Sequence, residues 1–172
     1  RMGVVWSCAP KYIANYPSIA RSYGEEIANQ YLVPVKSMID AGIHVAFEMD
    51  RDEYVWSDLE MLITRVVEGE VWGAHERIDR VSALKTLTIW GAEYVLREDQ
   101  LGSIETGKSA DLVILDRDYM SIPEEEISEI QSLMTVLNGR AMYVHSDFAA
   151  EANLRPNQAV ISTYQALRDR SN

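Results

Sequence analysis

Two short apolar runs joined by a helical segment constrain the fold of this chain most. "GVVWSCA" at 3–9 is rich in β-branched and aromatic residues and closes at Pro10, and "IHVAFEM" at 43–49 has the same character. Such runs are typical of buried strands. Between them, "PVKSMIDAG" at 34–42 begins with proline and ends with glycine, the residues favoured at the two ends of a helix. A strand, a helix and a second strand predict a βα unit with a parallel sheet, and so an α/β fold.

Two longer helices are indicated further along the chain. "SDLEMLITRVVEG" at 57–69 begins with Ser57, followed three residues later by Glu60, which is the pattern of a capping box. "DRVSALKTLTIWGAEYVL" at 79–96 has Asp79 in position to cap a second helix. Apolar residues at helical spacing predict a buried face for each helix. These faces comprise Leu59, Leu62, Ile63, Val66 and Val67 in the first, and Val81, Leu84, Leu87, Thr88, Gly91 and Val95 in the second.

After about residue 100 the pattern changes to short strands and turns. A purely apolar strand is predicted at 112–115, and a brief helical turn at 121–127. The run 132–144 predicts a hairpin, because its two apolar halves are joined by Asn138-Gly139, the preferred type I′ pair. This part is therefore expected to be a small antiparallel sheet, followed by a partly helical tail at 148–172.

The charge balance and the single cysteine exclude several kinds of partner. Sixteen basic and 27 acidic residues give a net charge of −11, which argues against nucleic acid because phosphate binding needs a basic surface. Cys8 is alone, so no internal disulfide can form, and we expect a small buried hydrophobe there. No apolar run reaches the ~18 residues of a membrane helix, so no membrane partner is expected. These features fit a cytoplasmic protein.

Acidic residues follow the second predicted strand at once. The run 43–49 already contains Glu48, and Asp50, Asp52 and Glu53 come directly after it. Burying a charge is costly, so this arrangement has two interpretations. Either the strand reaches the surface there and the acids are solvated, or one of them binds a cation.

Three stretches resemble the C-terminal portion of the amidohydrolase superfamily. They are "PVKSMIDAGIHVAFEMD", "SALKTLTIWGAEYVLREDQLGSIETGKSADLVILDRD" and "EIQSLMTVLNGRAMY". The branch they resemble is that of N-substituted formamide deformylase and related metal-dependent hydrolases. The middle stretch is the most specific, through its order Leu-Gly-Ser, then Gly-Lys-x-Ala-Asp-Leu-Val. Within it, Gly102, Gly107, Lys108 and Asp111 are expected to have structural roles.

The resemblance implies a metal-bearing (β/α)₈ TIM-type barrel with a small β-sandwich built from both chain ends. A whole barrel takes about 250 residues, so this chain would supply only its last strands and closing helices, at 1–98. The C-terminal sandwich segment would lie at 99–147, with the tail at 148–172. The rest of the fold is expected upstream of Arg1.

The resemblance also implies a role for Asp50. In this family the aspartate at the end of the eighth strand touches the metal site and acts as general base on a water. The family pattern just before it is Gly-Ser, whereas here it is Glu48-Met49. Glu48 is therefore an extra ligand, a second acid, a sign that the site has departed from ordinary metal chemistry, or a sign of altered substrate shape. The implied cofactor is a divalent metal, with zinc expected (one or two ions), whose other ligands would lie upstream of Arg1.

Loop residues beside the predicted strand ends are candidates for substrate contacts. Lys11 and Tyr12 follow the first strand, and Tyr54 and Trp56 follow Asp50. Lys11, Tyr12 and Trp56 would then bind substrate. The alternative is that they are ordinary loop residues that pack against their neighbours.

The three histidines show no ligand spacing. His44 is expected to be a hydrogen-bonded core residue, and His75 and His145 are expected at the surface. Asp52, Glu53 and Asp58 are expected to be solvated or to cap helices.

The resemblance implies hydrolysis of a C–N bond of the amide or N-formyl type, with Asp50 passing a proton to the leaving nitrogen. The alternative is a non-catalytic or truncated family member that serves as a scaffold or binding module. Expected partners are a small-molecule substrate, the upstream part of the same protein, and a second copy in a homo-oligomer. The isolated chain is expected to be inactive, since it holds at most one metal ligand. Half a barrel would also expose strand edges and apolar surface, so the chain is expected to be unstable as a monomer.

Overall fold

The computed structural model describes residues 3–50 and 54–155, which form an α/β fold. Strands β1 (Val5–Cys8) and β2 (His44–Phe47) pair in parallel, with Val5 opposite His44. Both predicted strands and their parallel pairing are therefore confirmed. No helix in the described part of the chain has the length and apolar character needed to cross a membrane.

The connection between β1 and β2 is more helical than its sequence indicated. It contains the 3₁₀ helix η1 (Pro10–Asn15) and the helices α1 (Tyr16–Tyr23), α2 (Glu25–Tyr31) and α3 (Val35–Asp40). Helix α3 is the predicted one. After it Gly42 adopts a φ of 75°, a conformation that glycine reaches without steric cost, and the chain turns into β2.

The helix predicted at 57–69 is displaced and shorter. Helix α4 spans Val55–Thr64 and ends at Arg65, whose φ is 56°. The chain then forms a small hairpin of β3 (Val66–Val67) and β4 (Glu70–Val71). Leu59, Leu62 and Ile63 are buried as predicted.

The predicted capping box is wrong. Ser57 lies inside α4, and its hydroxyl donates to the carbonyl of Tyr54 at 3.0 Å. Glu60 accepts instead from the backbone N–H of Ser128 at 2.7 Å, so a tertiary contact outweighs the local one.

The helix predicted at 79–96 is two helices. After the short η2 (Ala74–Glu76), α5 spans Arg80–Leu87 and α6 spans Ile89–Tyr94. Asp79 caps α5 as predicted, accepting from Ser82 N–H at 2.9 Å. The break lies at Thr88, with φ −117° and ψ −101°.

The buried face predicted for this segment is only partly right. Leu84 and Leu87 pack against the core, but Val81 and Val95 are exposed. The deeply buried side chains are instead Ala83 and Thr86. Since the helix breaks at Thr88, the two halves do not share one continuous face. Residues of the predicted face line a cavity of about 540 Å³ between α6 and β5, whose lining includes Leu87, Gly91, Val95, Ile104 and Val113.

The second half forms the predicted antiparallel sheet. Strands β5 (Leu112–Leu115), β6 (Ser132–Leu137) and β7 (Arg140–Val144) lie in that order, and the 3₁₀ helix η3 (Glu124–Glu129) connects the first two. Asn138 and Gly139 have positive φ in the hairpin turn. The last described helix is α7 (Ser146–Glu151), and most of the predicted tail lies outside the described residues.

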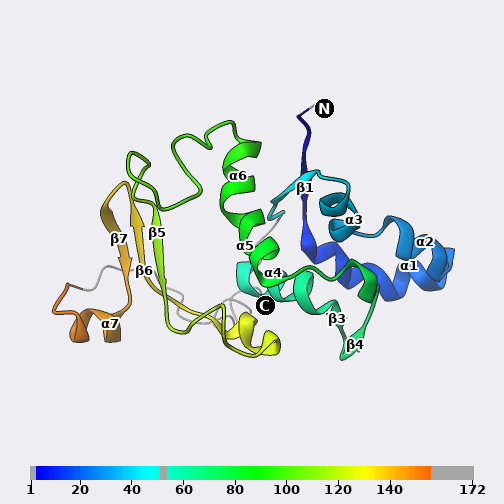
Figure 1. Ribbon diagram of the computed structural model, residues 1–172. Coiled ribbons are helices and arrows are strands. Elements are labelled where there is room, and N and C mark those ends of the chain that lie inside the picture. The colour runs from blue at the N-terminus through cyan, green and yellow to red at the C-terminus, as the bar shows by residue number, and fades with distance from the viewer. Residues whose placement is uncertain (1–2, 51–53, 156–172) are drawn as a thin grey trace.

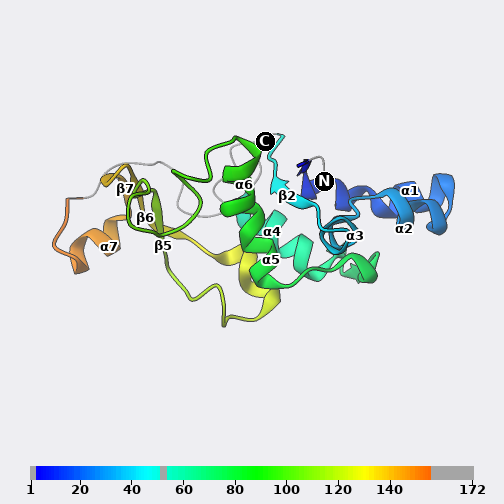
Figure 2. The same ribbon diagram turned by 45° about the horizontal axis from the view of Figure 1, so that its top comes forward.

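Helices α5 and α6 lie between the parallel pair and the three-stranded sheet, with α1 and α2 at the opposite end from the sheet (Figure 1 and Figure 2). The core forms where α4 packs against η1, η3 and α5, while α5 and α6 pack against β2. Hydrogen bonds between segments far apart in the sequence stabilise this core. The hydroxyl of Tyr54 donates to the carbonyl of Ile130, and the guanidinium of Arg80 donates to the carbonyls of Tyr119 and Ile122.

Burial makes Cys8 a poor nucleophile. Its side chain is buried among the core residues as predicted, and desolvation raises the pKa of its thiol to about 12. We expect a thiol reagent at pH 8 to modify Cys8 only when the chain unfolds. The raised pKa also means that the native state holds the proton more tightly, so stability is lost as pH rises from 9.0 towards 12. Rates of Cys8 labelling at pH 8, measured with and without urea, check the expected protection of the thiol. Fast labelling of the native chain would contradict it.

Gly102 has a structural role through a close approach. Its φ is +88°, and a Cβ there would lie 2.8 Å from the Ala92 Cβ and 2.9 Å from the Ile89 Cα. We expect Gly102→Ala to destabilise the fold by more than about 1 kcal/mol, because strain and overlap add. Gly107→Ala is the matched control, since its φ is +98° but nothing lies within 4 Å. The midpoint of urea unfolding is measured for both variants. Equal shifts of the two midpoints would show that the overlap at Gly102 contributes nothing to the loss of stability.

Candidate functional site

Three side chains meet where the two parallel strands end. The Lys11 Nζ lies 3.0 Å from the Asp50 Oδ2, and the Tyr12 hydroxyl donates to the same oxygen at 3.0 Å. Lys11 and Tyr12 belong to η1, which follows β1, and Asp50 follows β2. The structure therefore brings three sequence-predicted site residues together at the carboxyl edge of the parallel pair.

The local sequence explains why these side chains meet. The N–H of Glu48 donates to the Cys8 carbonyl at 2.8 Å, so the β1–β2 pairing continues to Glu48 and Asp50 lies only two residues beyond. On the other strand Pro10 begins η1, and Ile13 is fully buried in the core. This turn fixes the position of Lys11 and Tyr12 beside Asp50.

Glu48 also faces β1. Its carboxylate accepts a hydrogen bond from the Ser7 hydroxyl. Ser7 was not singled out in the sequence, although a hydroxyl inside an otherwise apolar strand is the kind of signal that marks such a partner. The Glu48 carboxylate thus has a neutral donor, and the Asp50 carboxylate has a cationic one.

The described residues do not form a metal site by themselves. Among residues 3–50 and 54–155, no three His, Cys, Asp or Glu side chains gather closely enough to hold an ion. Zinc in proteins takes three or four protein ligands, so Asp50 and Glu48 could each supply one carboxylate oxygen, and further ligands would be needed to complete a site. An anionic oxygen at the carboxyl edge of parallel strands suits that role.

Other acidic and aromatic candidates lie away from this cluster. Trp56 is part of α4 rather than a loop, is only 6% exposed, and packs against Tyr119 with ring centroids 6.1 Å apart. Asp58 is buried, so the prediction that it is solvated or caps a helix is corrected. Asp52 and Glu53 lie outside the described residues.

His44 is hydrogen-bonded, but it is not a core residue. Its Nδ1 pairs with the Glu93 carboxylate, and its ring stacks on Trp90 with centroids 5.0 Å apart. The side chain is 47% exposed. The reason is that His44 lies at the amino end of β2, where its side chain lines a cavity.

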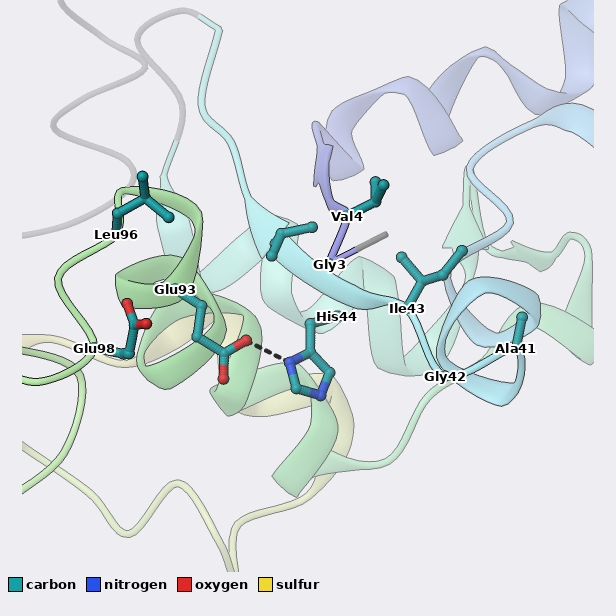
Figure 3. Close-up of a pocket in the computed structure, with 10 residues that line it drawn as sticks. Gly3, Val4, Ala41, Gly42, Ile43, His44, Glu93, Leu96 and Glu98 are labelled. Carbon is teal, nitrogen blue, oxygen red and sulfur yellow. Dashed lines mark hydrogen bonds and ion pairs between the residues drawn. The ribbon is translucent and has the colours of Figure 1, made fainter. Parts of the chain in front are cut away.

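His44 and Glu93 line a cavity of about 550 Å³ at the amino ends of the strands (Figure 3). Val4, Ile43 and Leu96 supply apolar lining. This cavity lies at the opposite strand ends from Asp50, so it is separate from the Lys11–Tyr12–Asp50 cluster.

The other two histidines differ in exposure. His75 is exposed as predicted and contacts the Asn29 carbonyl at 3.2 Å. His145 is only partly exposed and caps α7, where its Nδ1 accepts from the Asp147 N–H at 3.3 Å.

Comparison with known proteins identifies the family. The sequence pattern of the Amidohydrolase family matches residues 2–143. The chain belongs to the amidohydrolase family. The predicted resemblance is thereby confirmed.

Two curated amidohydrolase relatives show how much of a longer protein this chain matches. N-substituted formamide deformylase of Arthrobacter pascens is 36% identical over 124 residues, which are 70% of this chain and 23% of that protein. A 5-methylthioadenosine/S-adenosylhomocysteine deaminase of Thermodesulfovibrio yellowstonii is 30% identical over 136 residues, covering 67% of this chain and 31% of that protein. The chain thus spans less than a third of either relative.

Solved structures share the fold of this amidohydrolase chain. An adenosine deaminase from Xanthomonas campestris with bound zinc has a TM-score of 0.52 at 18% identity, covering 95% of this chain and 37% of that one. A variant of atrazine chlorohydrolase from Arthrobacter aurescens, complexed with zinc and atraton, has a TM-score of 0.52 at 19% identity. The match covers 91% of this chain and 37% of that one. At these identities the likeness concerns the fold alone.

Proposed function

We propose that this chain is the C-terminal segment of a metal-dependent amidohydrolase that hydrolyses a C–N bond of the amide or N-formyl type. Family membership supports the reaction class, and the deformylase relative supports the bond type. The chain's own contribution rests on the Asp50 cluster.

In the proposed architecture the parallel pair forms the last two strands of a (β/α)₈ barrel. Residues 1–98 would complete that barrel, 99–147 would form sandwich strands, and 148–172 would be a C-terminal tail. Two observations support this. Among the described residues β1 and β2 pair only with each other, and the antiparallel sheet is separate from them. Active sites of such barrels lie at the carboxyl ends of the strands, where Asp50 is found.

The observation that carries the proposal is the position of Asp50 just beyond β2 and beside two donors. The Asp50 carboxylate lies within hydrogen-bonding distance of the Lys11 ammonium and the Tyr12 hydroxyl, and a carboxylate can accept a proton. In the proposed reaction a water attacks the carbonyl carbon and loses a proton to the Asp50 carboxylate. The C–N bond then breaks, and Asp50 returns that proton to the leaving nitrogen.

A divalent metal, with zinc the expected ion, would polarise the carbonyl and make the water more acidic when bound. Asp50 would contribute one oxygen to hold it, and Glu48 is the second candidate. The remaining ligands would come from the upstream part of the same protein. A small molecule is the proposed substrate, since the substrates named for the relatives are small.

Native mass spectrometry of the full-length protein with metal analysis tests this function. We expect one or two divalent ions per chain, together with release of formate from an N-alkylformamide or of an acid from a simple amide. A protein that carries no metal and cleaves neither substrate would contradict the proposal. That result would favour the scaffold alternative.

A further inference from the structure

Two consecutive residues of η1 direct their polar groups to the same oxygen atom. The Lys11 ammonium and the Tyr12 hydroxyl both lie 3.0 Å from the Asp50 Oδ2. The Lys11 Nζ also lies 5.3 Å from the centroid of the Tyr12 ring, a distance within the range of cation–π attraction. The two side chains therefore support each other as well as the carboxylate.

Folding stability does not account for this convergence. The Asp50 side chain is 47% exposed and that of Lys11 is 19% exposed. Ion pairs this accessible contribute roughly 0–1 kcal/mol to folding, because water and salt screen them. Their effect is expected instead on the orientation of the carboxylate, since two donors on one oxygen restrict rotation about the side-chain bonds.

We infer that Lys11 and Tyr12 are positioning residues that hold the Asp50 carboxylate in its working orientation. This inference rests on the proposed function and deepens it. It gives Lys11 and Tyr12 a different role from the substrate contacts expected in the sequence, because both polar groups reach the acid itself. Proton transfer depends steeply on geometry, so a loosened carboxylate would lose rate while substrate binding stays intact.

A double-mutant cycle in the full-length protein tests the inference. With an N-alkylformamide as substrate, we expect Lys11→Met to lower kcat about 10- to 100-fold, as expected for a misplaced catalytic group. KM should stay within about twofold, because the substitution removes no contact that binds the substrate in the ground state. In an Asp50→Asn background the same substitution should have no further effect, since coupled residues are not additive. Tyr12→Phe should behave in the same way with a smaller loss, and Lys11→Arg should restore part of the rate.

Lys36→Met is the matched control. Lys36 forms an exposed ion pair with Asp40 on α3, away from the cluster, so its kcat and KM should be those of the unmodified protein. A second readout needs no substrate. In a crystal structure of the metal-free full-length protein carrying Lys11→Met and Tyr12→Phe, Asp50 should occupy more than one rotamer.

Three results would overturn the inference. The first is a KM that Lys11→Met raises equally with and without Asp50→Asn, which identifies Lys11 as a substrate contact. The second is a single unchanged Asp50 rotamer in the double variant. The third is a fall in thermal midpoint that parallels the loss of rate, which indicates a structural role. The proposed function itself fails differently, because Asp50→Asn alone would then leave kcat unchanged.

Discussion

Asp50→Asn is expected to lower kcat of the full-length protein about 100- to 10,000-fold, the usual contribution of a general acid–base group. The amide keeps the size and planar shape of the side chain, but an NH2 donor replaces one acceptor oxygen and the group cannot accept and return a proton. Lys11 would also lose its anionic partner, which lies 3.0 Å away. Because the aspartate and asparagine side chains have the same size and shape, the substitution should leave the folded structure intact. Steady-state kinetics on an N-alkylformamide measure the loss, and circular dichroism checks the fold.

Asp40→Asn is the matched control for this variant. Asp40 ends α3 and forms an exposed ion pair with Lys36. The same Asp-to-Asn change is therefore made away from the proposed active site. Its kcat should stay within about twofold of the unmodified protein, as for surface substitutions in general. Asp50→Asn with full activity would remove Asp50 from the mechanism. A loss equal in both variants would indicate a general effect of charge.

Arg65→Met is expected to destabilise the fold by about 3–5 kcal/mol, the range for removing one partner from a buried charged network. Arg65 is 1% exposed. Its guanidinium donates to the carbonyls of Trp72 at 3.2 Å, Val33 at 3.1 Å and Leu32 at 3.3 Å. Burial lowers the pKa of this guanidinium, and the nearby Glu76 carboxylate acts in the opposite direction. The substitution would leave three carbonyls without their donor.

The urea midpoint of the full-length protein measures this loss, together with the yield of soluble protein. Arg97→Met is the matched control, because Arg97 is exposed and its guanidinium donates to the Gln100 side chain at 2.7 Å. That variant should change stability by less than about 0.5 kcal/mol. Equal midpoints for the two variants would show that the buried contacts of Arg65 contribute little.

Local signals predicted the elements whose stability is local. The hairpin at Asn138-Gly139 and the Asp79 cap are confirmed because a two-residue turn or a single cap depends on neighbouring residues alone. The strand runs at β1 and β2 are confirmed because β-branched and aromatic runs suit buried strands in many contexts.

Errors arose where distant residues compete with local ones. Ser57 and Glu60 have the spacing of a capping box, but Glu60 bonds to Ser128 and the helix begins before Ser57. The run 79–96 has helical spacing throughout, yet it breaks at Thr88, against which the distant Gly102 packs so closely that a Cβ there would lie 3.0 Å from the Thr88 carbonyl oxygen. Neither competitor lies within the window in which a helical pattern is judged.

The sequence alone determined the α/β class, the parallel pair, the antiparallel hairpin and the amidohydrolase family, because these follow from patterns contained within short stretches. It also singled out Asp50, Lys11 and Tyr12 one by one. Only the tertiary structure decided that the last two reach the Asp50 carboxylate, that Trp56 is buried, and that Arg65 binds three carbonyls. The physical reason is that these contacts join residues separated by 7 to 63 positions, and their geometry is set by how distant segments pack together.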